Sequence, residues 1–158
     1  MSESEFSLLL ETHQNIIHKV CSIYTRSAAD HEDLFQEIVY QAYRSYHKFK
    51  GDSKVSTWLY RVSLYTALAI RRKKKVEAEQ YRTEAHFEQL EDPKQNYLSD
   101  LYRLIDELKP TDKALILLYL DDRSYEEMAD IMGLSLSNVG VRINRIKKKL
   151  TELWRSTN

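Results

Sequence analysis

The sequence predicts an all-α protein built from two small helical domains joined by a linker. Its 158 residues include only three glycines and two prolines, whereas all-β folds need many such residues at their turns. Apolar side chains recur at intervals of three, four and seven residues on both sides of the middle of the chain. Residues 77–97 are mainly acidic and poor in aliphatic side chains, which is typical of a linker. We therefore expect separate domains over residues 1–76 and 98–158.

Three helices are expected in the first domain. The first spans residues 6–24, with apolar positions at helical spacing. The second begins after Asp30, a candidate N-cap, and is broken by the sequence KGDS at residues 50–53. Its expected core positions are Leu34, Ile38, Ala42, Tyr46 and Phe49. The third helix follows over residues 55–75.

On the second and third helices, the side opposite the expected core positions carries a distinctive set of residues. The polar face of the second helix carries Asp33, Gln36, Glu37, Tyr40 and Arg44. It is either a solvent face or a binding face, because a tyrosine among acids suits both. The expected core side of the third helix carries Trp58, Leu59, Val62, Thr66 and Ala69. Its other side carries Tyr60, Arg61, Leu64, Leu68 and Arg71. That mixture of aromatic, aliphatic and cationic side chains favours an exposed binding surface over a plain solvent face.

Four helices are expected in the second domain. The first has an apolar stripe of Leu101, Leu104, Ile105 and Leu108. Thr111 is the expected N-cap of the next helix, which ends at the sequence DDRS. Ser124 and Glu127 have the spacing of a capping box, and Gly133 is placed to end that helix in the left-handed conformation. Ser135 then caps the last helix.

The last two helices form a helix-turn-helix, a motif of DNA-binding proteins. The core side of the last helix holds Val139, Ile143, Ile146 and Leu150. Opposite or beside it lie Ser137, Asn138, Val141, Arg142, Asn144, Arg145, Lys148 and Lys149. Small side chains let a helix approach base edges, Arg145 suits a bidentate contact to guanine, and Arg142, Lys147 and the following lysines can neutralise phosphates. Gly140 costs about 1 kcal/mol of helix propensity, and it reflects either close approach to DNA or simple tolerance.

The net charge of zero hides two basic segments. Residues 41–75 carry ten basic and one acidic residue, including the run from Arg71 to Lys75, and residues 131–158 carry six and one. Residues 1–40 and 76–130 are acidic. Two basic segments on separate helices indicate two contacts with a polyanion such as nucleic acid, although solvated helix faces remain the alternative for either one.

Other function classes find little support in the sequence. The five histidines show no metal-ligand spacing, and no glycine-rich phosphate loop or paired carboxylates are evident, so we expect no metal, cofactor or catalysis. The single cysteine, Cys21, is expected as a buried apolar residue in a reducing compartment. The apolar run near the N-terminus is too short for a signal peptide or a membrane span, which predicts a cytoplasmic protein without membrane insertion.

Two segments resemble one known family. The segment DLFQEIVYQAYRSYHKFKGDSKVSTWLYRVSLYTALAIRRKKK, residues 33–75, resembles the second conserved region of bacterial sigma factors. The segment RSYEEMADIMGLSLSNVGVRINRIKKKL, residues 123–150, resembles their fourth region. The length and the order of the regions are those of the extracytoplasmic function (ECF) group of the sigma-70 family. The resemblance implies a sigma factor that binds the RNA polymerase core and directs transcription initiation. The alternative is a stand-alone helix-turn-helix transcription regulator.

The resemblance also implies roles for residues. The residues expected to contact the polymerase clamp helices are Asp33, Gln36, Glu37 and Tyr40. Recognition and opening of the −10 element falls to Phe49, Tyr60, Arg61, Tyr65, Leu68, Arg71 and Arg72. Recognition of the −35 element falls to Ser137, Asn138, Gly140, Val141, Arg142, Asn144, Arg145, Lys148 and Lys149. Further partners implied are the polymerase flap and an anti-sigma factor. Many relatives have asparagine in place of Tyr65 and a basic residue in place of Gly140, so the bases preferred at both elements stay open.

Overall fold

The protein is helical throughout the part that the structure describes. The computed structural model describes the backbone of residues 3–81 and 97–157, and the side chains of residues 3–77 and 100–157. These ranges contain seven helices and no strand, which confirms the predicted all-α class. The chain divides into two compact units, residues 1–91 and 92–158. Most of the predicted linker, 77–97, lies outside the described residues.

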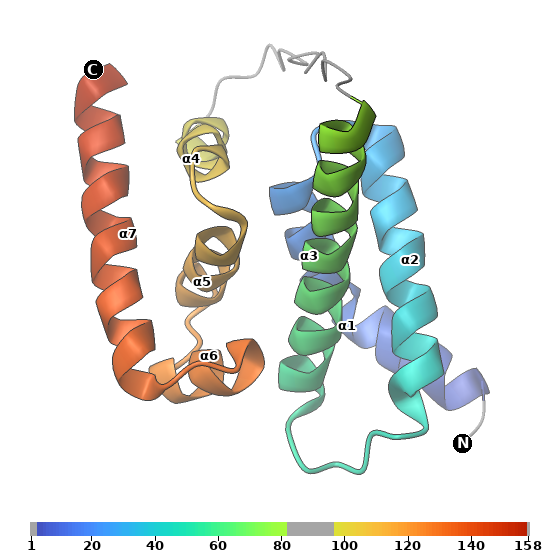
Figure 1. Ribbon diagram of the computed structural model, residues 1–158. Coiled ribbons are helices and arrows are strands. Elements are labelled where there is room, and N and C mark those ends of the chain that lie inside the picture. The colour runs from blue at the N-terminus through green and yellow to red at the C-terminus, as the bar shows by residue number, and fades with distance from the viewer. Residues whose placement is uncertain (1–2, 82–96, 158) are drawn as a thin grey trace. The chain divides into compact units, whose positions relative to one another are not determined.

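The first unit is a three-helix bundle of α1 (Glu3–Tyr24), α2 (Ala28–Tyr46) and α3 (Val55–Tyr81) (Figure 1). Each helix contacts the other two. The contributions of α1 to the core are Phe6, Ile16, Ile17, Val20, Cys21 and Ile23. Those of α2 are Leu34, Ile38 and Ala42, as predicted, whereas the predicted core residues Tyr46 and Phe49 are only half-buried and Phe49 lies beyond the end of the helix. The core is therefore built at the spacing of three and four residues that the sequence shows.

Two details of this unit differ from the predictions. The N-cap of α2 is Ser27 and not Asp30: the Ser27 hydroxyl oxygen accepts a hydrogen bond from the Asp30 amide at 3.0 Å. Asp30 therefore lies in the first turn, where a carboxylate is favoured by the helix dipole. The helix α3 continues to Tyr81, beyond its predicted end at residue 75.

The buried arc of α3 is wider than predicted. Its buried residues are Thr57, Trp58, Leu59, Tyr60, Ser63, Leu64 and Ala67. The predicted core positions Val62 and Thr66 are only half-buried, and Ala69 is exposed. Because α3 packs against both α1 and α2, side chains on two of its sides enter the core. Trp58 is among them and lies against Phe49, with ring centroids 5.1 Å apart.

The second unit consists of α4 (Tyr97–Asp106), α5 (Pro110–Leu120), α6 (Tyr125–Met132) and α7 (Leu136–Thr157). The central helix is α5, whose residues 113–118 are all buried and which contacts α6 and α7. Its N-cap is Lys109, with Pro110 in the first position, so the predicted cap Thr111 lies inside the first turn. Proline suits that place because its missing amide hydrogen would have no partner within the helix.

The helix-turn-helix has the predicted caps. The Ser124 hydroxyl oxygen accepts a hydrogen bond from the Glu127 amide at 3.1 Å, and that of Ser135 accepts one from the Asn138 amide at 3.2 Å. Gly133 ends α6 with a φ of 67°, a left-handed conformation that favours glycine. Two capped helices with a left-handed turn between them fix the direction in which α7 leaves α6 (Figure 1).

Candidate nucleic-acid and partner interfaces

The outer face of α7 is the candidate duplex-binding surface. Val139, Ile143 and Ile146 are buried, as predicted, whereas the predicted core residue Leu150 is only half-buried. α7 contacts α4, α5 and α6. The exposed residues among the predicted set are Ser137, Val141, Asn144, Arg145, Lys148 and Lys149. Asn138, Gly140 and Arg142 are half-buried. The face thus joins small and amide side chains in its N-terminal half to cations in its C-terminal half.

Two cations of α7 have partners inside the unit. Arg142 Nε donates a hydrogen bond to Asn138 Oδ1 at 3.3 Å, which uses one of the five N–H donors of the guanidinium group. The ammonium group of Lys147 lies 4.3 Å from the centroid of the Tyr119 ring on α5. Contact with the Tyr119 side chain raises the pKa of Lys147. Lys147, which sequence reasoning grouped with the phosphate-neutralising cations, therefore packs against α5.

Gly140 faces α6, and the surrounding structure does not require a glycine there. A Cβ atom built at this position would lie 3.8 Å from Tyr125 Cε2, its nearest neighbour, which is an ordinary van der Waals distance. The conformation at Gly140 is helical, so left-handed geometry does not explain the residue either. Neither packing nor backbone conformation in the second unit therefore explains the glycine.

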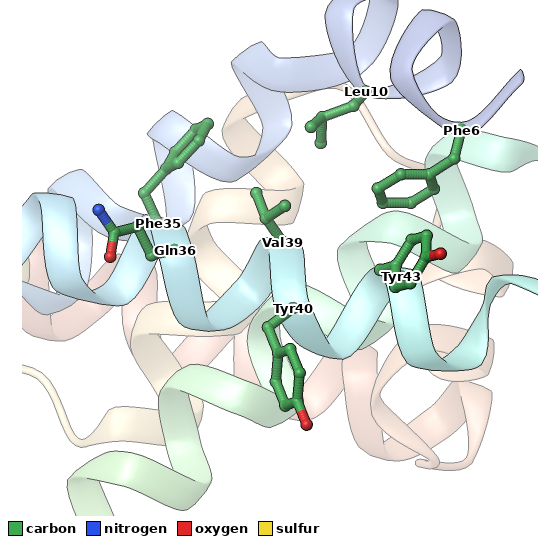
Figure 2. Close-up of a pocket in the computed structure, with 7 residues that line it drawn as sticks. All are labelled: Phe6, Leu10, Phe35, Gln36, Val39, Tyr40 and Tyr43. Carbon is green, nitrogen blue, oxygen red and sulfur yellow. The ribbon is translucent and has the colours of Figure 1, made fainter. Parts of the chain in front are cut away.

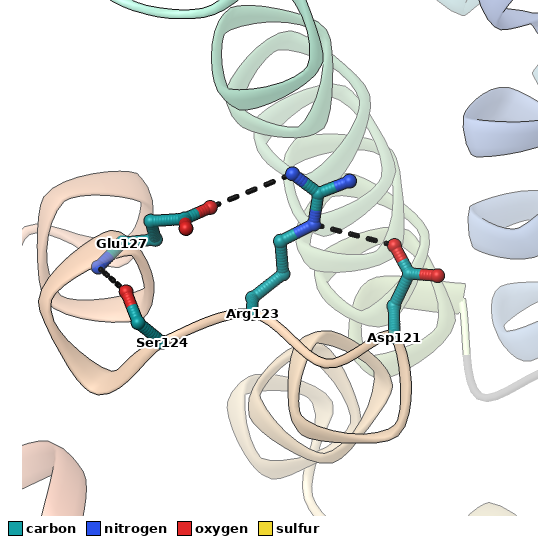
Figure 3. Close-up of polar contacts among 4 residues, drawn as sticks. All are labelled: Asp121, Arg123, Ser124 and Glu127. Carbon is teal, nitrogen blue, oxygen red and sulfur yellow. Dashed lines mark hydrogen bonds and ion pairs between the residues drawn. The ribbon is translucent and has the colours of Figure 1, made fainter.

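The turn between α5 and α6 is held by a polar cluster of Asp121, Arg123, Ser124 and Glu127 (Figure 3). Arg123 Nε lies 3.3 Å from Asp121 Oδ2, and its Nη1 lies 3.4 Å from Glu127 Oε2. The Glu127 side chain, expected to complete the capping box at Ser124, is thus turned to Arg123. Asp122 adopts a φ of 57°, a conformation rare for residues other than glycine. The cluster joins the end of α5 to the start of the helix-turn-helix.

The candidate strand-binding surface on α3 is a stripe of aromatic, aliphatic and cationic side chains. Arg61, Tyr65, Leu68 and Arg72 are spaced four, three and four residues apart and so share one side of the helix. Tyr65 is 47% exposed, and Arg71 and Arg72 are also exposed. Arg61, Leu68 and the nearby Phe49 are half-buried.

Tyr60 does not belong to that surface. Its side chain is completely buried, as is that of Leu64, so the expectation that both lie on the exposed side of α3 was wrong. Both face the core because α3 packs between α1 and α2. In the sequence, a tyrosine and a leucine next to an arginine are equally compatible with a binding face and with a core position. Only the packing of the three-helix bundle distinguishes the two.

The polar face of α2 is exposed as predicted. Asp33, Gln36 and Tyr40 are open to solvent, and Glu37 is half-buried. Gln41 Nε2 donates a hydrogen bond to Glu37 Oε1 at 3.0 Å, which fixes that carboxylate on the helix. The guanidinium carbon of Arg44 lies 5.7 Å from the centroid of the Tyr40 ring. This face joins negative charge to a large aromatic side chain, a combination suited to a protein partner.

An apolar groove of about 460 Å³ lies next to that face, between α1 and α2 (Figure 2). We call it the α1–α2 groove. It is lined by Phe6, Leu10, Phe35, Gln36, Val39, Tyr40 and Tyr43. Gln36 and Tyr40 therefore belong to both surfaces. Tyr43 is half exposed, and its ring meets the Phe6 ring edge-on with centroids 5.3 Å apart. Sequence reasoning missed the groove; its signal was the exposed pair Tyr40 and Tyr43 beside the apolar positions Phe35 and Val39.

Two histidines join α1 and α2 at the far end of the groove. His18 Nδ1 and His31 Nε2 are 3.0 Å apart, while the ring centroids are 5.3 Å apart. Because the facing nitrogens are so much closer than the centroids, the rings meet edge to edge through an N–H···N hydrogen bond. Phe35 of the groove stacks on His18 at a centroid distance of 4.6 Å. The pKa of His31 is lowered mainly by desolvation and, to a smaller extent, by electrostatic repulsion from His18.

The described residues offer neither a metal site nor a membrane-spanning helix. Within residues 3–77 and 100–157, histidine, cysteine and acidic side chains form no group of three or more placed to hold a metal ion. Cys21 is completely buried, as predicted, and burial raises the pKa of its thiol to about 11. The thiol is therefore protonated at neutral pH. Over the described helices, none combines the length and apolar character that crossing a bilayer demands.

Comparison with known proteins assigns both units to the same kind of protein. The family model for sigma-70 region 2 matches residues 9–77, and that for sigma-70 region 4 matches residues 98–150. The ECF RNA polymerase sigma-E factors of Escherichia coli strain K12 and Salmonella typhimurium strain LT2 are each 33% identical to this chain over 167 aligned residues. Each alignment covers 94% of this chain and 85% of the relative.

Two solved structures have the same fold at low sequence identity. The sigma factor RpoE from Bartonella quintana, in complex with the anti-sigma factor NepR, superposes with a TM-score of 0.79 at 19% identity. That match covers 96% of this chain and 97% of the other. CnrH, in complex with the cytosolic domain of CnrY, superposes with a TM-score of 0.73 at 19% identity, covering 99% and 92%.

Proposed function

Because the chain belongs to the ECF sigma factors of the sigma-70 family, we propose that it binds the RNA polymerase core and directs it to promoters. The observation that carries the proposal is a cationic helix face in each unit, on α3 in the first and on α7 in the second, together with the exposed polar face of α2 within the first unit. A stand-alone regulator needs only the helix-turn-helix, and the surfaces of the first unit would then have no role. The protein acts in the cytoplasm and has no catalytic activity of its own.

At the −35 element, α7 enters the major groove with its outer face. Ser137, Asn138, Gly140, Val141 and Asn144 approach base edges, since their side chains are short. Arg145 makes a bidentate contact to guanine. Arg142, Lys148 and Lys149 contact phosphates, which position the helix without reading sequence.

At the −10 element, the stripe on α3 holds single-stranded DNA. The exposed ring of Tyr65 stacks on an unpaired base, and Leu68 extends the apolar contact. Arg61, Arg71 and Arg72 follow the phosphate backbone. Phe49 lies at the edge of this surface, against Trp58, where a flipped base is held. Tyr60 supports the surface from the core instead of contacting DNA.

The α2 face docks on the polymerase. Asp33, Gln36, Glu37 and Tyr40 contact the clamp helices, and the α1–α2 groove beside them accepts apolar side chains of the same partner. The second unit contacts the flap. Residues 77–97 act as the linker between residues 1–76 and 98–158. Because the sigma factor RpoE, which has the same fold, is bound to the anti-sigma factor NepR in its solved structure, we include a protein of that class among the partners.

The proposal is tested by transcription with purified chain and polymerase core on genomic templates. The double variant Asp33→Lys and Glu37→Lys reverses the charge of the α2 face and should abolish most core binding. The matched control, Glu107→Lys and Glu126→Lys, makes the same change in charge at exposed positions of the second unit and should bind core normally. Normal holoenzyme formation by the α2 variant would remove the docking assignment, and DNA-dependent repression without core binding would favour the stand-alone regulator.

A further inference from the structure

The outer face of α7 carries one branched apolar side chain, Val141. It is 49% exposed and lies almost directly opposite the buried residues Val139, Ile143 and Ile146 on the helix. Valine is a poor choice for a solvent-facing helix position, because its χ1 freedom is restricted there and alanine or a charged residue favours the helix more. Val141 therefore stands at the centre of the candidate duplex-binding surface without improving the stability of the unit.

The neighbours of Val141 permit close approach to a partner. Ser137, one turn earlier, ends in a short hydroxymethyl group, and Gly140 has no side chain at all. The fold does not require the glycine at position 140, since a Cβ atom there would meet only an ordinary contact with Tyr125. Of the cations nearby, Arg142 is half-buried and hydrogen-bonded to Asn138, while Arg145 and Lys148 lie one and two turns further along. A short side chain reaches a groove floor only where the backbone comes close, and this half of α7 has the clearance for it.

The major groove offers one apolar group to such a side chain. The C5-methyl group of thymine projects into the groove, whereas the other base edges there present hydrogen-bond donors and acceptors. Valine has no hydrogen-bonding group in its side chain and so discriminates by apolar contact alone. Resting on the DNA-binding role proposed above, we propose that Val141 reads a thymine methyl group in the −35 element and is a specificity-determining residue of this sigma factor.

The test removes the methyl group from the DNA and the side chain from the protein in turn. Holoenzyme made from the full chain first defines its −35 element by start-site mapping and by selection from randomised −35 sequences. Each thymine of that element is then replaced by deoxyuridine, which lacks only the C5-methyl group and keeps its base pairing. Promoter binding is measured for the wild type and for Val141→Ala.

The expected result is a coupling confined to one position. At one thymine, deoxyuridine should weaken binding by wild-type holoenzyme about fourfold, the equivalent of one buried methyl group. Val141→Ala should lose about as much on the thymine promoter and be indifferent to deoxyuridine at that position, because each change removes the same contact. Since alanine favours the helix, circular dichroism should show the variant folded.

A control and two outcomes separate this inference from the proposed function. Leu120→Ala removes an apolar side chain of nearly equal exposure, 50%, from the end of α5 and should respond to deoxyuridine as the wild type does. A bound −35 element without thymine, or a deoxyuridine penalty that is the same in the wild type and in Val141→Ala, overturns the inference while leaving the proposed function intact. Absence of any −35 dependence, with Arg145→Ala and Lys148→Ala as active as the wild type, overturns both.

Discussion

The helices α3 and α7 both present cations to solvent, yet they are anchored in different ways. α7 contacts α4, α5 and α6, but its buried residues Val139, Ile143 and Ile146 form one narrow stripe, so the opposite side of the helix is open. α3 contacts two helices and buries side chains on two of its sides, which leaves a strip around Tyr65 exposed before residues 71–77, all of which are exposed. The comparison teaches that the accessible part of a binding helix depends on how far its buried side chains spread around it, not on how many helices it contacts. The two surfaces also suit different tasks. The wide face of α7 fits the groove of a duplex, and the narrow strip on α3 fits a single strand.

The largest expected effect separates the buried and exposed tyrosines of α3. Tyr60→Ala should reduce the free energy of unfolding of the first unit by about 3–5 kcal/mol, as for other large buried aromatic residues. Tyr65→Ala, five residues along the same helix, should change it by less than about 0.5 kcal/mol, because surface substitutions rarely cost more.

The two tryptophans make this measurement specific to one unit. Trp58 reports on the first unit and Trp154 on the second, so a Trp154→Phe background leaves fluorescence from the first unit alone during urea unfolding. Equal losses of stability in the two tyrosine variants would show that Tyr65 is not exposed on α3 as described. Tyr65→Ala should instead impair promoter opening, by about 1–3 kcal/mol for one stacked base.

The next effect distinguishes the two kinds of cation on α7. Arg145→Ala should cost about 1–3 kcal/mol at a single base pair of the −35 element and relax specificity there. Lys148→Ala should weaken binding to all sequences alike and make it less sensitive to salt. Binding titrations on single-base variants of the promoter at two salt concentrations measure both. An equal loss on every sequence for Arg145→Ala contradicts base readout by that residue.

A smaller effect tests the wide buried arc of α3. Ser63 is completely buried, and within the described part of the chain its hydroxyl oxygen has no hydrogen-bond partner. Ser63→Ala should therefore stabilise the first unit by about 1 kcal/mol, because it removes a desolvated polar group at little cost in volume. Urea unfolding in the Trp154→Phe background measures the change, and a loss of stability would place Ser63 in a polar contact instead.

The smallest effect is a pH dependence expected only of the first unit. The pKa of His31 in the folded protein lies below its usual value of 6.5, so near pH 6 the unfolded chain binds more protons than the folded one. The contribution of His31 to stability is present above pH 6.5 and is lost as the pH falls from that value through the lowered pKa of the folded state. His31→Gln should flatten the fall measured by Trp58 fluorescence between pH 7.5 and 5.5. All five histidines precede residue 97, so the second unit should lack this dependence; an unchanged slope in His31→Gln would remove the assignment.

The success of sequence reasoning followed how narrow the buried side of each helix is. On α7 the buried residues Val139, Ile143 and Ile146 were predictable because they form a single apolar stripe, whereas the predicted core residue Leu150 is only half-buried. Tyr60 and Leu64 were misassigned, since a helix packed on two sides shows no clean stripe. The N-cap was placed at Asp30 because both serine and aspartate serve that role, and only the backbone selects Ser27.

The features that sequence reasoning missed join residues far apart in the chain. The α1–α2 groove needs Phe6 beside Tyr43, and the histidine pair needs His18 beside His31. Neither juxtaposition follows from periodicity, which gives the face of a residue but not its partner on another helix. The residues of the Arg123 cluster are close in sequence. However, Glu127 pairs with Arg123 instead of completing the expected capping box, and this depends on the position of Asp121 at the end of α5.

The central claim is that α3 and α7 contact different promoter elements at the same time. It is tested most directly by photo-crosslinking from a benzophenone side chain placed at Tyr65 or at Asn144 in active holoenzyme on a mapped promoter. We expect position 65 to crosslink to the unpaired strand at −10 and position 144 to the duplex at −35. Crosslinks from both positions to one element, or from neither in holoenzyme that still initiates transcription, would contradict the account.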